Sequence, residues 1–202
     1  MKKILFILFV IAAARFIYLE NDHVSHGPGV LAPESPEQQE ITQPEVFTRD
    51  DYTITPLAEF RVKAKVLARE NYRFGRESDL SPVDLALGWG RMSDENIVDL
   101  IDFSQSNRWY TWRTEELPIL AKEISAQSAN MHLIPGNKQV HTSINQTRTG
   151  DIVVLSGKLV RVDAEDGWQW SSSLSRIDTG ASSCELIWVE SFEIQDPQGS
   201  SD

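Results

Sequence analysis

The apolar start of the chain sets the organisation of everything after it. Residues Ile4 to Ala14 include no polar side chain, and the apolar run resumes after Arg15 as far as Leu19. Lys2 and Lys3 precede it, which gives the basic n-region and hydrophobic segment of an export signal. Because so apolar a stretch must leave water, it enters either a membrane or a protein core.

Three interpretations of residues 1–19 are open. The sixteen residues from Ile4 to Leu19 span roughly 24 Å as a helix, slightly less than a hydrocarbon core of about 30 Å. Arg15 and Tyr18 suit the headgroup region. We favour an uncleaved, single-pass anchor in the inner membrane over a cleaved signal peptide and over a buried core helix. The two lysines then stay in the cytoplasm, and the rest of the chain is periplasmic or otherwise extracytoplasmic.

Charge excludes one class of partner. The 202 residues include 30 acidic and 19 basic side chains, a formal charge of −11. Three of the basic residues, Lys2, Lys3 and Arg15, belong to the N-terminal segment, so the remainder has 16 basic and 30 acidic side chains and a charge of −14. A body this acidic is repelled by phosphate backbones, and no dense run of Lys or Arg offsets the charge. We expect no nucleic acid partner.

Residues 20–51 have the composition of a linker. Four prolines are separated by polar and acidic residues, which predicts an extended, largely uncollapsed spacer. An apolar island at residues 29–32 could instead dock onto the domain, but we favour the linker. The globular domain is expected over residues 52–194, followed by a disordered tail at residues 195–202.

Five segments of the domain have strand-like sequences. Phe60, Val62, Ala64 and Val66 alternate with polar or basic residues, the period of a half-buried strand. Further strands are predicted for four later segments from their β-branched and aromatic content. They are residues 102–113, 152–162, 168–174 and 185–194.

Helix signals are short and scattered. Ser81-Pro82-Val83-Asp84 places an N-cap before a first-turn proline, which predicts a helix that ends at the glycines 88 and 90. Ser93-Asp94-Glu95 repeats the start signal for a second helix, and Asn137 is expected to cap a third helix that ends near Thr147. Together with the strands, this order predicts an α+β, mainly β domain: a small OB-like antiparallel barrel of five or six strands. An irregular α+β sandwich is the alternative.

One polar group lies in the predicted strand at residues 128–135. Asn130 and His132 would share one face of that strand, with Met131 and Leu133 on the other. A histidine is a natural general base near neutral pH, yet catalysis also needs a nucleophile and an orienting acid. We favour structural hydrogen bonding for Asn130 and His132.

A tryptophan pair marks the second candidate site. Trp168, Trp170 and Ser172 would share one strand face, where two indoles could form a flat platform for a sugar or an aromatic ligand. Arg176 and Asp178 are the nearest polar residues. The alternative, which we favour, is that both indoles fill the core while Arg176 pairs with Asp178. Trp109, Tyr110 and Trp112 pose the same question.

No cofactor or metal site is predicted. Asp22, His23 and His26 are three candidate ligands in a linker, which makes at most a weak metal site. Cys184 is the only cysteine, so no intrachain disulfide forms and no Cys-rich zinc spacing exists. We expect it to be a small core residue.

Three segments together resemble a known family. They are Asp79 to Gly90, Ser128 to Pro135, and Trp168 to Glu185. In these segments the chain resembles short bacterial proteins of unknown function with an N-terminal membrane segment. The resemblance implies an exported, membrane-anchored protein and carries no activity or catalytic residue.

The leading hypothesis is a membrane-tethered, extracytoplasmic binding or assembly module. Its ligand would be a partner protein or an envelope glycan, bound near Asn130, His132, Trp168, Trp170, Arg176 and Asp178. The alternative is an extracytoplasmic hydrolase that uses His132 with Ser128, Ser172 or Cys184 as the nucleophile.

Overall fold

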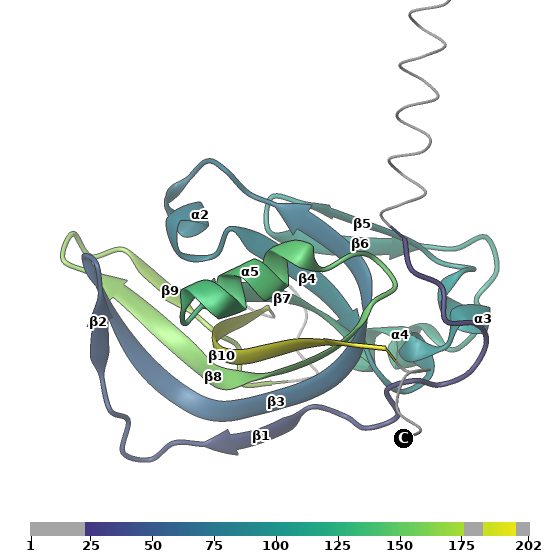
Figure 1. The fold of residues 1–202 in the computed structure, drawn as a ribbon, viewed down its shortest axis with the longest axis horizontal. Coiled ribbons are helices and arrows are strands. Elements are labelled where there is room, and N and C mark those ends of the chain that lie inside the picture. Colours follow the sequence, from purple (N-terminus) through teal and green to yellow (C-terminus); the bar gives the residue numbers. More distant parts are fainter. Residues whose placement is uncertain (1–22, 176–183, 197–202) are drawn as a thin grey trace, which may run out of the picture.

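The protein is mainly β, with short helices at its periphery. The computed structural model describes residues 23–175 and 184–196 (Figure 1). Its strands are β1 (Glu37–Glu40), β2 (Phe47–Arg49), β3 (Tyr52–Asn71), β4 (Val83–Gly88), β5 (Asp102–Ser106), β6 (Trp109–Arg113), β7 (Ser128–Pro135), β8 (Ile152–Ala164), β9 (Gln169–Ser171) and β10 (Glu185–Gln195). Its helices are α2 (Arg76–Leu80), η1 (Gly90–Ser93), α3 (Glu95–Val98), α4 (Ala121–Ala126) and α5 (Lys138–Gln146). The prediction of a mainly β domain with short helices is confirmed.

Five long strands make a sheet that closes partly into a ring. Strand β3 pairs with β4, β4 with β7, β7 with β10, β10 with β8, and β8 again with β3. Only the β7–β10 pair is parallel. Figure 1 shows β3 and β8 as long, curved neighbours, and β3 pairs with β8 along its first part and with β4 along its last. Bulges at Pro56/Ala58 and Val66/Ala68 bend β3 so that it reaches both partners.

The barrel interior holds the main hydrophobic core. Phe60, Val62, Ala64 and Val66 of β3 all point into it, as their alternation predicts. Strands β4, β7, β8 and β10 contribute the remaining apolar side chains from their inward faces. Helix α5 lies against β7 and β10, with Val140 and Ile144 packed into this core. Asn137 caps α5 by accepting a hydrogen bond from the Val140 amide at 3.0 Å, so this predicted helix is confirmed.

Two predicted elements are wrong. Ser81 to Asp84 begins no helix: Val83–Gly88 is strand β4, paired with β3 and β7. A short apolar run that is buried on both faces has no clear period, so its strand pairing decides its conformation. Residues 102–113 form no single strand either, because Asn107 and Arg108, at φ angles of 51° and 69°, turn the chain into the β5–β6 hairpin.

The predicted spacer is folded onto the domain wherever it is described. Strands β1 and β2 both pair with β3. Residues 23–32, called the strap below, lie along η1 and α3, and Ala32 at the end of the apolar island is fully buried. At Gly150 a side chain is impossible, because a Cβ there would lie 1.9 Å from the Val24 carbonyl oxygen of the strap. The prediction of an uncollapsed linker over this part is therefore wrong.

Three consecutive side chains fasten the strap. Ser93 Oγ accepts hydrogen bonds from the Leu31 and Ala32 amides, and Asp94 Oδ1 accepts one from the Gly29 amide. Glu95 accepts three, from the His26 and Gly27 amides at 2.7 Å and from the Ser25 hydroxyl at 2.9 Å. The Ser93-Asp94-Glu95 motif therefore both starts a helix and binds the strap through hydrogen bonds.

Glu95 also forms the most deeply buried lysine–carboxylate pair of the described chain. Lys65 Nζ of β3 lies 2.8 Å from Glu95 Oε1, with side-chain exposures of 2% and 7%. Burial alone would raise the pKa of Glu95. Hydrogen bonds from the His26 amide, Lys65 and Ser25, with the charge of Lys65, outweigh burial and lower that pKa to about 2. The ionised carboxylate thus joins strap, helix and barrel.

Two predicted segments lie outside the described residues. They are the membrane anchor at residues 1–19 and the tail beyond residue 196. Within the ranges 23–175 and 184–196, no helix combines the length and the apolar character that a membrane span requires.

The Glu95 carboxylate predicts a particular loss of stability in acid. Because its folded pKa lies below its ordinary 4.5, its contribution is complete above pH 4.5 and is lost as pH falls towards about 2. In urea unfolding of the full chain, Glu95→Gln should therefore be less stable than the native protein at neutral pH. The difference should shrink as the pH approaches about 2. The exposed Glu115→Gln serves as the control, and an equal deficit of Glu95→Gln at all pH values would contradict the assignment.

Candidate functional site

The outer face of β4 and β7 carries polar side chains in a largely apolar barrel. Because Leu85 and Met131 point into the core, their neighbours Asp84, Asn130 and His132 point outwards. Asp84 and His132 lie opposite each other in the antiparallel register. We call this surface the β4–β7 face.

An acid, an imidazole and a guanidinium meet there. Asp84 Oδ1 lies 2.7 Å from Arg108 Nη1, and Asp84 Oδ2 lies 2.8 Å from His132 Nδ1. Side-chain exposures are 0% for Asp84, 4% for His132 and 18% for Arg108. The second contact lacks hydrogen-bond alignment, so it is electrostatic and becomes a salt bridge only with a protonated ring. Asp84 is thus a buried carboxylate whose charge is balanced mainly by Arg108.

Arg108 reaches this face because the β5–β6 hairpin folds over it. Its backbone amide donates to the Tyr72 hydroxyl at 2.9 Å, and its carbonyl accepts from Asn130 Nδ2 at 3.0 Å. Its Nη1 donates also to the Ser81 carbonyl at 2.9 Å. A positive φ is costly for an arginine, and it persists only where surrounding contacts over-determine it. A further hydrogen bond joins the hairpin to β7, since Gln105 Nε2 donates to Asn130 Oδ1 at 2.7 Å.

Aromatic rings surround these charges. The Arg108 guanidinium lies 3.8 Å from the centroid of Tyr72 and 5.6 Å from that of Trp170. The rings of His132 and Trp170 are 5.0 Å apart, and those of Trp168 and Trp170 are 6.2 Å apart. Desolvation by burial raises the pKa of Tyr72, although the hydrogen bond from the Arg108 amide acts against it.

A second arginine repeats the arrangement at the edge of the site. The Arg76 guanidinium lies 4.8 Å from the Trp168 centroid and 5.4 Å from that of Tyr52. Its Nη1 donates to Asp166 at 2.7 Å, and hydrogen bonds to Asp166 and then to Tyr52 raise the pKa of Arg76 above its usual range. The Asp166 pKa is lowered by the same pair. Each of the two indoles, Trp168 and Trp170, therefore has a cation–π contact with one of the two arginines.

The tryptophan pair differs from both sequence interpretations. Trp168 and Trp170 are each half-buried, so they neither fill the barrel core nor stand free. Their planes meet at 61°, edge to face, so the predicted flat platform is wrong. Offset and edge contacts are the ones that ring quadrupoles favour.

No protein-family model, curated protein or solved structure matches this chain.

The site combines predicted residues with missed ones. Asn130, His132, Trp168 and Trp170 are brought together, whereas Arg176 and Asp178 lie outside the described residues. Sequence reasoning missed Tyr72, Arg76, Asp84 and Arg108. Because Val83–Gly88 is buried on both faces, its sequence carries no clear local signal that places Asp84 on an outer strand face.

The hydroxyls and the thiol predicted as nucleophiles for a hydrolase form hydrogen bonds to backbone groups. Ser128 Oγ donates to the Ile124 carbonyl at 2.7 Å and lies 2.8 Å from the Tyr110 hydroxyl. Ser172 Oγ donates to the Ser173 carbonyl and accepts from the Leu186 amide. The Cys184 thiol lies 3.9 Å from the Arg108 carbonyl oxygen. Tyr110 and Trp112 pack against the apolar cluster of Leu67 and Met92, whereas Trp168 and Trp170 pack against a different cluster.

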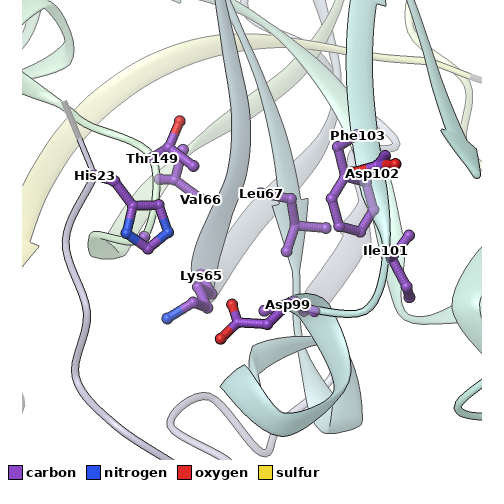
Figure 2. A pocket seen from close by; sticks show the side chains of 11 residues that line it. His23, Lys65, Val66, Leu67, Asp99, Ile101, Asp102, Phe103 and Thr149 are labelled. Atoms are coloured by element: carbon purple, nitrogen blue, oxygen red, sulfur yellow. The ribbon is translucent and has the colours of Figure 1, made fainter. Parts of the chain in front are cut away.

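The strap forms a separate pocket where it meets the barrel. Figure 2 shows its wall of His23 and Thr149 on one side and Leu67, Asp99, Asp102 and Phe103 on the other. Its volume is about 220 Å³, and Lys65, which lines it, forms an ion pair with Glu95.

Across the described ranges, no three His, Cys, Asp or Glu side chains are placed to hold a metal ion. Of the three predicted linker ligands, Asp22 lies outside those ranges.

Loss of the Arg108 charge should destabilise the fold much more than loss of a surface arginine. Arg108→Gln leaves the fully buried Asp84 without its cation, which costs about 3 kcal/mol of unfolding free energy. The matched control is Arg91→Gln, whose partner Glu123 is 3.5 Å away with side chains 50% and 26% exposed. It should cost under about 1 kcal/mol. Urea unfolding of both variants measures this, and equal small losses would show that the buried cluster contributes little.

Proposed function

We propose that this chain is a membrane-tethered, extracytoplasmic binding module that takes an envelope glycan at the β4–β7 face. The observation that carries the proposal is the pair of half-buried indoles, held beside His132 by two arginines. Rigid aromatic surfaces with a few fixed polar groups are the usual walls of a carbohydrate or aromatic-ligand site.

The strand order supports assigning the barrel to the OB type. Five strands pair in the order β3-β4-β7-β10-β8-β3, and α5 lies between the third and fourth of them along the chain. Barrels of this type bind oligonucleotides and oligosaccharides on their second and third strands and adjoining loops. Those strands here are β4 and β7. The loops are residues 72–82, which include Tyr72 and Arg76, and the segment after β8, which carries Trp168 and Trp170.

Charge favours a glycan over a nucleic acid among the ligands of such barrels. The chain has a net charge of −11, and both site arginines already have a carboxylate partner. Neutral sugar rings need no net positive charge, since they bind through stacking and hydrogen bonds. Arg176 and Asp178 follow β9 in sequence and are proposed to supply further hydrogen bonds. Asn130 is occupied by Gln105 and Arg108, so it positions the hairpin.

The tether rests on residues 1–19 as a single-pass inner-membrane anchor. The basic start, the apolar run and the resemblance to anchored bacterial proteins support it. The strap begins four residues after Leu19, which would keep the domain next to the bilayer.

A hydrolase that uses His132 is the second candidate. The Asp84 carboxylate 2.8 Å from Nδ1 is the observation in its favour, because a nearby negative charge stabilises the imidazolium that forms when His132 accepts a proton. Release of soluble fragments from a glycan would distinguish this candidate from a binding module.

Glycan binding should depend on Trp168 and Trp170. The full chain, solubilised in neutral detergent, should sediment with peptidoglycan sacculi, and Trp168→Ala and Trp170→Ala should each weaken this at least about tenfold, as expected for a lost stacking contact. Trp109→Ala is the matched control, because Trp109 is 43% exposed on β6. Equal binding by all four proteins, or none by the native chain, would reject the glycan ligand.

The proposed orientation has its own test. Alkaline phosphatase fused after Asp202 should be active in intact cells, because this reporter folds only outside the reducing cytoplasm. Moving Lys2 and Lys3 beyond residue 19 should reduce the activity, since basic residues stay cytoplasmic. Activity of a fluorescent cytosolic reporter fused at the same position would show the opposite orientation.

A further inference from the structure

A second pocket lies at the end of β7 beside α5, and it shares no residue with the polar cluster of Asp84, Arg108 and His132. It is formed by β2, the turn between β7 and α5, the start of α5, and Trp188 of β10, and its volume is about 420 Å³. That size lies within the ordinary range for small-molecule sites. None of its lining residues belongs to the β4–β7 face.

The lining of this pocket is basic, against the charge of the whole protein. Arg49, Lys138 and His141 line it, and its described lining includes no Asp or Glu. Among the residues that the structure describes, neither Arg49 nor Lys138 forms an ion pair. In a chain of net charge −11, two cations without carboxylate partners in one concavity make a local site for an anion.

Arg49 is held ready for such a ligand. Its Nη1 donates to the Pro135 carbonyl oxygen at 2.6 Å, and its guanidinium lies 5.4 Å from the Trp188 ring centroid. These contacts hold the guanidinium beside Trp188. They leave Nη2 and Nε without a partner in the described chain, and this planar fork can pair with the two oxygens of a carboxylate.

The remaining walls are aromatic. Trp188 and Phe47 meet edge to face with centroids 4.8 Å apart. Gly136 keeps the turn against Trp188, because a Cβ there would lie 2.7 Å from the Val189 carbonyl oxygen and 3.2 Å from the indole Nε1. An apolar, flat group therefore fits beside the cations.

A neighbouring pocket shows that the charge arrangement is one-sided. It shares Phe47 and Trp188 but is lined by Glu45, Glu59 and Glu190, with Lys158 paired to Glu190. An anion is repelled from that side of the aromatic pair and attracted to the other.

We propose that the pocket of Arg49, Lys138, His141, Phe47 and Trp188 binds a small aromatic carboxylate. The carboxylate pairs with Arg49 and Lys138, and the ring lies against Trp188. This site is independent of the glycan proposed for the β4–β7 face.

Isothermal titration calorimetry on the full chain in neutral detergent tests the site with indole-3-acetate. The neutral indole-3-acetamide should bind at least about tenfold more weakly, the size of one charge-assisted hydrogen bond. Arg49→Gln and Lys138→Gln should each lower the affinity for the acid by a similar factor without altering binding of the amide. Lys138 is exposed at the helix start, so its substitution leaves the fold intact. Raising the salt concentration should lower the affinity for the acid and leave the affinity for the amide unchanged.

Arg61→Gln is the matched control, since Arg61 is an exposed arginine on β3 outside this pocket. Its affinity for the acid should equal that of the native chain. The proposal is overturned if acid and amide bind equally, if Arg61→Gln weakens binding as much as Lys138→Gln, or if the acid fails to bind at millimolar concentration. Loss of glycan binding in the Trp168→Ala variant would leave this titration unchanged.

Discussion

The buried pair of Lys65 and Glu95 is the contact on which the organisation of the chain depends. A lysine in the longest strand of the barrel is almost fully removed from water, and only a carboxylate in the same place makes that tolerable. Glu95 comes from the insertion between β4 and β7, and it also accepts three hydrogen bonds from the strap. One carboxylate thereby couples three separate parts of the sequence, so that strap, insertion and barrel are expected to order together.

The same insertion builds the candidate site. Residues 89–127 leave the barrel after β4 and return at β7, and the β5–β6 hairpin within them carries Arg108 back over those two strands. The barrel supplies the buried acid and imidazole, and the insertion supplies the cation. Because the acid is fully buried, the hairpin turn is held in place by electrostatics as well as by hydrogen bonds to Tyr72 and Asn130. The ring of Trp170 then lies beside His132 and Arg108, and that of Trp168 lies beside Trp170.

Local signals account for what could be predicted from the sequence. Asn137 and the apolar residues one turn apart are local signals for α5, and the alternation in β3 and the β-branched run of β8 are local signals for strands. Val83–Gly88 is buried on both faces, so its own pattern cannot distinguish strand from helix. Arg108 is the clearest case for the site: its partners lie at least 22 positions away, and no spacing rule connects them. The composition of residues 20–51 likewise predicts a linker, because the hydrogen bonds that hold its first part are made by distant residues, Ser93, Asp94 and Glu95.

If residues 1–19 anchor the chain as proposed, docking of the strap limits how far the domain can travel. A free linker of 32 residues could extend about 110 Å, whereas only four peptide steps separate Leu19 from His23, a contour of about 14 Å. For a chain anchored as proposed, the domain would sample a thin layer above the bilayer instead of searching the depth of the envelope. Any glycan or small acid it meets must then come within that layer, which confines the protein to encounters at the membrane surface.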